Sequence, residues 1–441
     1  MAEDLTTPLA ELIAIPSISA DSTHAADVRA AGEWVCERIR GAGGTAELVL
    51  RGEQPLAIGE VRASQDAATA RTVLCYGHFD VQPPDPLELW QSPPFELDER
   101  DGWLYARGIA DDKGQLFMLL EATRRLAAAG ELPVNVRFTC DGEEETGGHS
   151  IVDFLAEDER GADAAVVFDS DMLAPGRPAF NVAVRGLCYY HLSVRTGGQD
   201  LHSGVYGGAA LNAMHALVQA LSGVVPANGR VPEPLRVGIV PPTNDEVAGW
   251  ASLPEGRGEL AGLNATPADA RAADEFYLRT WAEPSVDVHG LAGGSPMLQK
   301  TVLPVQAEAN VSIRLAPGQT VREIAPVFER LVRDAAPAGA EVSLDLQSSS
   351  DPGLVPPDAG ALRLAADAFE DVVGTRPVLI RSGGTIPLVP ALSARGIPAI
   401  VTGFALKDSN VHAPNERLRT DYLPLGVTAA GEVLRRLGSL R

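Results

Sequence analysis

The chain contains 441 residues, of which 45% are hydrophobic and 22% are charged, as is typical of a soluble globular protein. This length exceeds what one ordinary hydrophobic core requires, so we expect two domains. A formal net charge of -23 argues against a nucleic-acid partner, because nucleic-acid binding depends on basic patches. No apolar run approaches the ~20 residues of a membrane helix, and the acidic start has no signal-type apolar stretch, which predicts a cytoplasmic protein without a membrane partner.

Helix-like and strand-like segments alternate in the first part of the chain. Helical periodicity covers residues 26–42, 115–129 and 150–157, and strand-like runs cover residues 72–75, 134–140 and 164–168. This alternation predicts an α/β fold with a mostly parallel central sheet.

The cysteines do not indicate disulfides. Cys36, Cys75, Cys140 and Cys188 have no paired spacing, and three of them lie in apolar, strand-like runs. We therefore expect buried free thiols.

The pattern changes near residue 186. Strand-like runs cover residues 187–195, 307–315 and 341–346, and helical periodicity covers residues 208–221 and 321–335. These elements fit a β-α-β-β-α-β module with a long excursion, rich in Pro, Gly and Ala, from residue 224 to residue 300. The α/β pattern returns from about residue 352, with a helix over 359–373, strands near 378 and 398, and a final helix. We therefore predict a split core domain, residues 1–185 and 350–441, with an α+β domain of residues 186–349 inserted into it.

Residues that can bind metal follow several of the predicted strands. His78 and Asp80 follow the first strand, Glu144 and Glu145 follow the strand that ends near residue 140, and Asp169 follows the next. Ligands bind at the carboxyl ends of the strands in open α/β sheets. Carboxylates gathered there would repel one another, and two divalent cations would neutralise them. A mixed set of imidazole and carboxylate ligands suits zinc, with manganese or cobalt as alternatives.

Six segments of the chain resemble one family of enzymes. In chain order they read YGHFDVQPP, LYARGIADDKG, PVNVRF, LHSGVYGG, SIRLAP and HAPNE. They resemble the dinuclear metallopeptidases that include carnosinase, cytosolic dipeptidase, aminoacylase, acetylornithine deacetylase and succinyl-diaminopimelate desuccinylase. The resemblance covers nearly the whole chain and is closest to the carnosinase-like dipeptidases. It implies that the split domain is catalytic, and that the inserted domain is a lid and dimerisation domain of a homodimer.

The resemblance also implies the metal ligands. His78 and Asp169 would bind one ion, Glu145 and His412 would bind the other, and Asp111 would bridge the two. The peptide bond that follows Asp111 would be cis. Asp171 stays open as an alternative to Asp169, because the two lie only two residues apart.

Further roles follow from the same resemblance. Asp80 would orient His78, and Glu144 would be the general base that takes a proton from the metal-bridging water, which leaves Glu143 at a variable position. In the inserted domain, His202 would stabilise the oxyanion and would act from the partner subunit.

The resemblance also places the substrate carboxylate. Arg314 would bind it through its guanidinium group, and the loop of Gly383, Gly384 and Thr385 would contribute to the same end of the site. Ser382 departs from the family, where carnosinase-like dipeptidases commonly have a glutamate that meets the substrate's amino group.

These observations predict a metal-dependent hydrolase that cleaves the peptide bond of dipeptides or similar small amides with a free carboxylate. An N-acyl-amino-acid deacylase is the alternative within the enzyme class, and Ser382 favours it because the charge that would select a free amine is missing. The alternative from another class is a non-catalytic metal-binding or scaffolding protein. Retention of the base Glu144 argues against that alternative.

Overall fold

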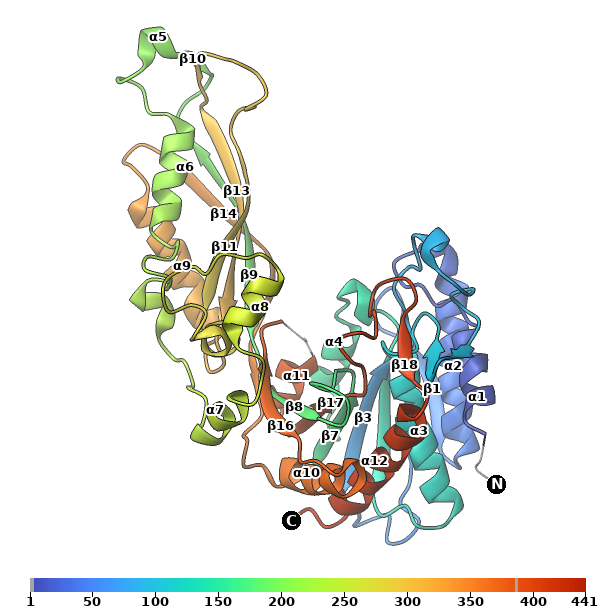
Figure 1. The fold of residues 1–441 in the computed structure, drawn as a ribbon. Coiled ribbons are helices and arrows are strands. Elements are labelled where there is room, and N and C mark those ends of the chain that lie inside the picture. The colour runs from blue at the N-terminus through green and yellow to red at the C-terminus, as the bar shows by residue number, and fades with distance from the viewer. Residues whose placement is uncertain (1–3, 385–387) are drawn as a thin grey trace. The chain divides into compact units, whose positions relative to one another are not determined.

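The computed structural model describes residues 4–384 and 388–441. The chain folds into two compact units. The first unit comprises Met1–Val182, Val355–Ile380 and Ala391–Arg441, and the second comprises Ala183–Leu354 and Arg381–Pro390. Both units can be followed in Figure 1 by their colours and labels.

The first unit is built on a mixed sheet with the strand order β1-β2-β6-β3-β7-β17-β8. The strands are β1 Thr45–Leu50, β2 Pro55–Val61, β3 Thr72–His78, β6 Asn135–Asp141, β7 Ala164–Phe168, β8 Ala179–Val184 and β17 Ala399–Thr402. The central strands β6, β3, β7 and β17 are parallel to one another, whereas β1, β2 and β8 pair antiparallel with their neighbours. The predicted parallel sheet is therefore found at the centre, and its edges are antiparallel. Strand β8 ends in the second unit, where β15 Gly353–Leu354 pairs with Ala183 and Val184. The short strand β16 Val378–Ser382 also pairs with β8.

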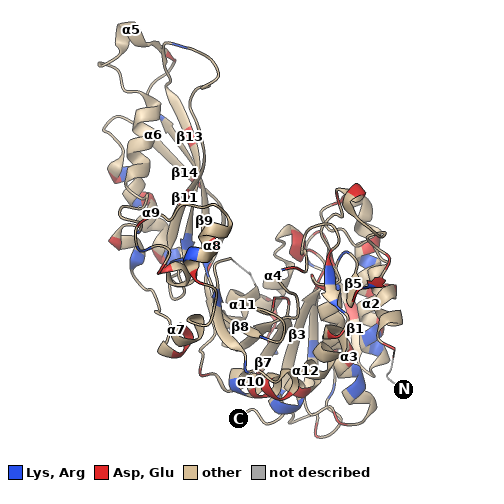
Figure 2. Cartoon of the chain, viewed as in Figure 1, with Lys and Arg blue, Asp and Glu red and all other residues tan. Residues whose placement is uncertain are grey.

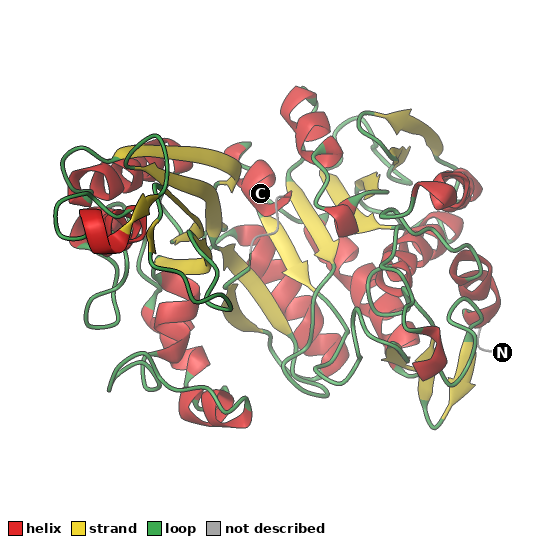
Figure 3. Ribbon diagram, turned by 90° about the horizontal axis from the view of Figure 1, so that it is seen from above, coloured by secondary structure: helices red, strands yellow, loops and turns green. Residues whose placement is uncertain are grey.

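The helices, drawn red in Figure 3, pack against strands of this sheet or against one another. They are α1 Thr6–Ile13, α2 Ala25–Gly41, α3 Lys113–Ala128, α4 Ser150–Glu157, α10 Gly360–Val373, α11 Leu388–Ala394 and α12 Tyr422–Leu437. Most residues of α3 are buried because the helix contacts α1, α2, α12 and β3. Since α3 begins directly after Asp111 and Asp112, its packing holds this part of the chain at the carboxyl end of the sheet.

Short elements complete the first unit. A small sheet has the order β18-β5-β4 and joins Arg417–Arg419, Trp103–Tyr105 and Asp98–Arg100. Short 3-10 turns cover Ser22–His24, Leu87–Leu89 and Glu144–Thr146. The pairing of β18 with β5 brings the C-terminal segment that carries His412 beside the segment that precedes Asp111.

The second unit contains an antiparallel sheet with the order β11-β13-β9-β14. Its strands are β9 Gly186–Arg195, β11 Ser285–Ala292, β13 Gln306–Leu315 and β14 Glu341–Ser350. The helices α6 Ala213–Ser222 and α9 Val321–Ala335 share a hydrophobic core with these strands. The succession β9-α6-β11-β13-α9-β14 is the predicted module. Helix α9 carries both basic and acidic residues (Figure 2), and its buried residues include Ile324, Phe328 and Val332.

The long excursion supplies β11, which its sequence pattern does not predict. It also contains α7 Asn244–Trp250, α8 Gly256–Gly262, a 3-10 turn Glu233–Arg236 and a π-helical turn Leu278–Ala282. The remaining elements are α5 Ser203–Tyr206 and a two-stranded sheet of β10 Leu201–His202 and β12 Val302–Leu303. Helix α6 begins five residues later than predicted, because the Asn212 side chain caps it by accepting the N–H groups of Met214 and His215.

Two predictions from composition can be compared with the structure. The four cysteines all lie in the described part of the chain, and each is buried and free, as expected. Within residues 4–384 and 388–441, no helix combines the length and hydropathy needed to cross a membrane.

Candidate active site

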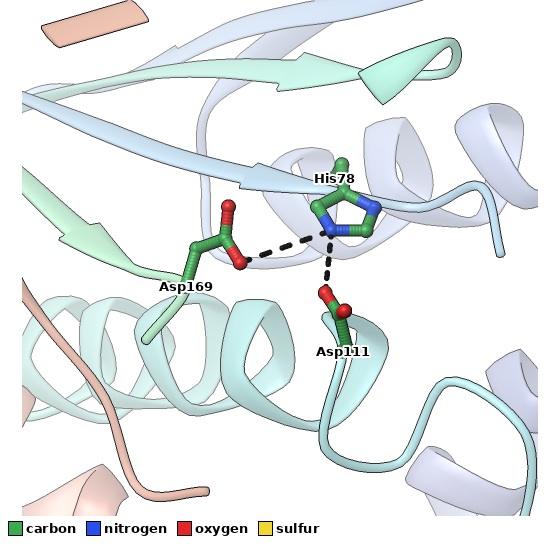
Figure 4. Close-up of side chains that lie close together, drawn as sticks. All are labelled: His78, Asp111 and Asp169. Carbon is green, nitrogen blue, oxygen red and sulfur yellow. Dashed lines mark hydrogen bonds and ion pairs between the residues drawn. The ribbon is translucent and has the colours of Figure 1, made fainter. Parts of the chain in front are cut away.

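His78 ends β3 and is completely buried. Its Nδ1 atom lies 3.1 Å from the main-chain oxygen of Asp80, which can only accept a hydrogen bond. Nδ1 therefore carries the proton, and the lone pair of Nε2 is available to a cation. Nε2 faces two carboxylates: Oδ1 of Asp111 at 3.0 Å and Oδ1 of Asp169 at 3.9 Å (Figure 4).

Asp111 lies at the centre of the site, and its two carboxylate oxygens face different histidines. Oδ1 contacts His78, and Oδ2 lies 2.9 Å from Nε2 of His412. The same His412 nitrogen lies 3.0 Å from Oε2 of Glu145. Within the described residues, two groups of possible metal ligands thus share Asp111: one with His78 and Asp169, the other with Glu145 and His412. All five residues that were predicted as ligands are brought together.

The electrostatics of the site favour bound cations. Burial, together with the nearby Asp111 and Glu144 carboxylates, raises the pKa of Asp169 to about 8. Hydrogen bonds to Asp111 and Glu145 raise the pKa of His412 to about 10. The shift of the His412 pKa reflects attraction to the carboxylates, and the shift of the Asp169 pKa reflects burial and repulsion between carboxylates, which bound cations would relieve. The donor set of two imidazoles and three carboxylates therefore fits two divalent ions.

Asp80 connects the histidine to the two glutamates that follow β6. It is buried, and Oδ1 lies 3.4 Å from Nδ1 of His78. Its carboxylate also accepts the main-chain N–H groups of Glu144 at 3.3 Å and Glu145 at 3.1 Å, and the Ser19 hydroxyl at 2.6 Å. Asp80 thus fixes the turn that carries Glu144 and Glu145 as well as the ring of His78.

The two glutamates differ in their partners. The Glu145 carboxylate accepts a hydrogen bond from the Gln82 amide at 2.8 Å, in addition to its contact with His412. The Glu144 carboxylate has no hydrogen-bond or ion-pair partner among the described residues, and burial raises its pKa. A carboxylate with a raised pKa and no fixed partner is suited to accept and release a proton.

Two acidic neighbours of these residues are excluded from the ligand clusters. Asp171 is exposed and lies in neither cluster, whereas Asp169 lies in one. Glu143 is buried, and its carboxylate accepts the main-chain N–H of Gln54 and both the N–H and the hydroxyl of Ser150. The Glu143 side chain therefore anchors the start of α4, a contact that the sequence does not predict.

A further residue, Glu416, organises the segment that carries Asp111. Its buried carboxylate accepts the N–H groups of Gly108 at 3.0 Å, Ala110 at 2.8 Å and Asp111 at 3.1 Å, and it pairs with Arg107 at 2.7 Å. The sequence indicates no role for Glu416, although the motif HAPNE contains it. The peptide bond between Asp111 and Asp112 is cis, as the family resemblance implies.

The other predicted residues belong to the second unit. His202 is exposed, and its Nδ1 accepts the N–H of Gly204 at 3.0 Å. Arg314 lies on β13, opposite Ser285 of β11. In the turn after β16, Gly384 donates its N–H to Oγ of Ser382 at 3.1 Å. Thr385 lies outside the described residues.

Known proteins share the sequence features behind this geometry. Residues 74–436 match the family described as Peptidase family M20/M25/M40. The chain therefore belongs to this peptidase family, and its identification from sequence as a metallopeptidase is confirmed.

Relatives resemble the chain over most of its length. The Cysteinylglycine-S-conjugate dipeptidase of Corynebacterium striatum is 27% identical over 450 residues, which cover 98% of this chain and 94% of the relative. The Beta-Ala-His dipeptidase of Homo sapiens is 29% identical over 372 residues, which cover 80% of this chain and 73% of the relative. The solved structure of an M20 family metallo-carboxypeptidase, Sso-CP2 from Sulfolobus solfataricus, has a TM-score of 0.82 and 25% identity, and the match covers 99% of both chains. The predicted fold class, α/β with an inserted α+β domain, is confirmed.

Proposed function

We propose that this protein is a dipeptidase that depends on two divalent metal ions and acts on small substrates with a free carboxylate. The observation that carries the proposal is the shared position of Asp111, which faces His78 with one oxygen and His412 with the other. The dipeptidase activity of relatives that are similar over most of the chain supports the substrate class.

In this proposal each ligand cluster binds one ion. His78 and Asp169 bind the first, Glu145 and His412 bind the second, and Asp111 belongs to both. The mixed nitrogen and oxygen donors favour zinc, and manganese or cobalt could replace it. Such ions supply Lewis-acid chemistry that makes water a usable nucleophile near neutral pH.

The remaining side chains handle protons and charge. Glu144 accepts the proton of the attacking water and delivers it to the leaving amine, a role supported by its raised pKa and its lack of a fixed partner among the described residues. Asp80 holds His78 in the required tautomer. His202 stabilises the developing oxyanion from a partner subunit, and Arg314 with the Gly383–Gly384 turn binds the substrate carboxylate.

The domain roles and the setting of the enzyme follow from the same proposal. Residues 1–185 and 350–441 form the catalytic domain, and residues 186–349 form a lid and dimerisation domain. We propose a cytoplasmic homodimer that has neither nucleic-acid nor membrane partners, in line with the net charge of -23.

The alternative of an N-acyl-amino-acid deacylase would use the same ions and the same base. It is less favoured, because the relatives that cover most of the chain are dipeptidases. The hydroxyl of Ser382, at the position that favoured this alternative, accepts a hydrogen bond within its own turn. Family membership and the half-buried base Glu144 argue against a non-catalytic scaffold.

A substrate panel tests the proposal. The purified chain, loaded with zinc or manganese, is assayed with dipeptides, with N-acetyl amino acids and with N-acetylated dipeptides. We expect hydrolysis of dipeptides that a chelator abolishes and a divalent metal restores. Faster hydrolysis of N-acetyl amino acids than of any dipeptide would support the deacylase, and no hydrolysis of either class would refute the proposed chemistry.

A further inference from the structure

Arg185, in the link between β8 and β9, joins separate segments of the second unit. Its Nε atom donates a hydrogen bond to the main-chain oxygen of Gly383 at 3.1 Å. Its Nη1 atom donates to Oγ of Ser285 at 3.2 Å and to the main-chain oxygen of Glu283 at 3.4 Å. One guanidinium group therefore holds the turn after β16 against the beginning of β11.

This guanidinium group lies near that of Arg314. Ser285, which contacts Arg185, pairs with Arg314 in the β11–β13 register, and Arg314 also pairs with Leu187 of β9. Burial lowers the pKa of Arg185 to about 10, and repulsion from Arg314 contributes to the shift. Two cationic side chains thus lie near each other at one end of the sheet, and the Asp287 carboxylate offsets part of their repulsion by raising the pKa of Arg185. A substrate carboxylate would offset more of it.

The turn is also confined from its other side. A Cβ atom at Gly383 would lie 2.8 Å from the main-chain oxygen of Thr280. Thr280 belongs to the π-helical turn Leu278–Ala282, a rare conformation that often occurs at functional sites. The turn at Gly383 is therefore packed between Thr280 and Arg185, so that its main-chain position depends on both.

We propose that Arg185 is a positioning residue for the carboxylate end of the substrate. It holds the Ser382–Gly384 turn in place beside Arg314 and adds a second positive charge there. This inference rests on the proposed dipeptidase function and deepens it, because two arginines, Arg314 and Arg185, would then select substrates that have a free carboxylate. A guanidinium group is planar and carries several N–H donors, so it suits this role better than the ammonium group of a lysine does.

The test compares a dipeptide with its C-terminal amide in the full-length, metal-loaded enzyme. We expect Arg185→Gln to raise KM for the free dipeptide about tenfold or more, with kcat and the kcat/KM of the amide changed less than about threefold. Arg185→Lys keeps the charge without the fork and should recover part of the loss. If the wild type does not cleave the amide, the inhibition constant of the amide replaces its kcat/KM.

A second variant and a control separate positioning from folding. Gly383→Ala leaves Arg185 intact but displaces the turn from Thr280, and it should cause the same selective loss. Arg195→Gln is the control at the other end of β9. It removes a guanidinium group whose Nε donates to the main-chain oxygen of Gly197, and it should leave the kinetic constants for both substrates unchanged. Thermal unfolding shows which variants are folded. If Arg185→Gln does not fold, the kinetics of Gly383→Ala and Arg185→Lys provide the test instead.

The outcomes also separate this inference from the proposed function. A wild type that hydrolyses no dipeptide refutes the dipeptidase, whatever Arg185 does. If the wild type hydrolyses dipeptides and the variants lose kcat/KM equally for the free dipeptide and for its amide, only the proposed role of Arg185 is overturned.

Discussion

The carboxylate of Glu416 accepts the main-chain N–H of Asp111 at 3.1 Å, across 305 positions of sequence. The same carboxylate accepts the N–H groups of Gly108 and Ala110. Glu416 therefore fixes the main chain of the residue that both ligand clusters share. His412 lies only four positions earlier, so one short C-terminal segment supplies one candidate ligand and orients another.

This relationship predicts that Glu416→Gln weakens metal binding. In the variant, the amide NH2 group replaces one carboxylate oxygen and faces main-chain N–H groups, which then lose their acceptor. We expect about 10- to 100-fold lower metal affinity, the usual effect of losing a residue that orients a ligand. Calorimetric titration of the metal-free protein with zinc measures this change. Breaking the buried pair with Arg107 should also cost about 3–5 kcal/mol of stability, which chemical denaturation measures. Glu370→Gln, at an exposed ion pair, is the control, and equal metal affinity in the two variants would contradict the role of Glu416.

The shared ligand predicts different metal contents for two aspartate variants. Asp111→Asn should lower the occupancy of both sites, because both clusters contain Asp111. Asp169→Asn should lower the occupancy of only one. Elemental analysis of dialysed protein gives the metal-to-protein ratio. Asp171→Asn is a matched control two residues from Asp169 and should keep the wild-type ratio. If Asp171→Asn lost metal and Asp169→Asn did not, the assignment of the ligand would have to be reversed.

Glu144 and Glu143 should respond differently to the same substitution. Glu144→Gln should keep its metal and lose at least about 10²-fold in kcat, the usual contribution of a general acid–base residue. Glu143→Gln should lower the melting temperature, because Glu143 holds Gln54 and Ser150, while turnover per folded molecule stays near that of the wild type. Steady-state kinetics, thermal unfolding and metal analysis of both variants provide the comparison. Loss of metal with retained turnover in Glu144→Gln would mean that Glu144 is a ligand.

The proposed action of His202 from a partner subunit predicts complementation. Glu144→Gln and His202→Ala proteins are each expected to be inactive, and mixing them should restore part of the activity in hybrid dimers that contain one intact site. A mixture of Glu144→Gln with Asp111→Asn is the control, because both residues lie in the first unit and no intact site can form. Absence of recovery, in a mixture where exchange of subunits is demonstrated, would count against a shared site.

Local sequence patterns were sufficient to predict several strands, the candidate metal ligands and the enzyme family. The apolar runs over residues 72–75 and 164–168 predict β3 and β7, because a buried parallel strand needs continuous apolar residues. The acidic and imidazole side chains that follow such runs indicate metal ligands. The order of motifs along the chain identified the enzyme family, and it predicted as ligands the five residues that the fold brings together.

Only the tertiary structure decided which of the remaining polar residues act together. Glu416, Gln82 and Arg185 make contacts with residues far away in the sequence, and periodicity reports only neighbours within a few positions. Strand β11 was hidden in an excursion rich in Pro and Gly, because its stability comes from pairing with β13 instead of from its own pattern. Glu143 and Glu144 are adjacent and chemically identical, so only their surroundings distinguish them. Glu143 accepts hydrogen bonds at the start of α4, whereas Glu144 lies near His78, Glu145 and Asp111 of the candidate ligand clusters.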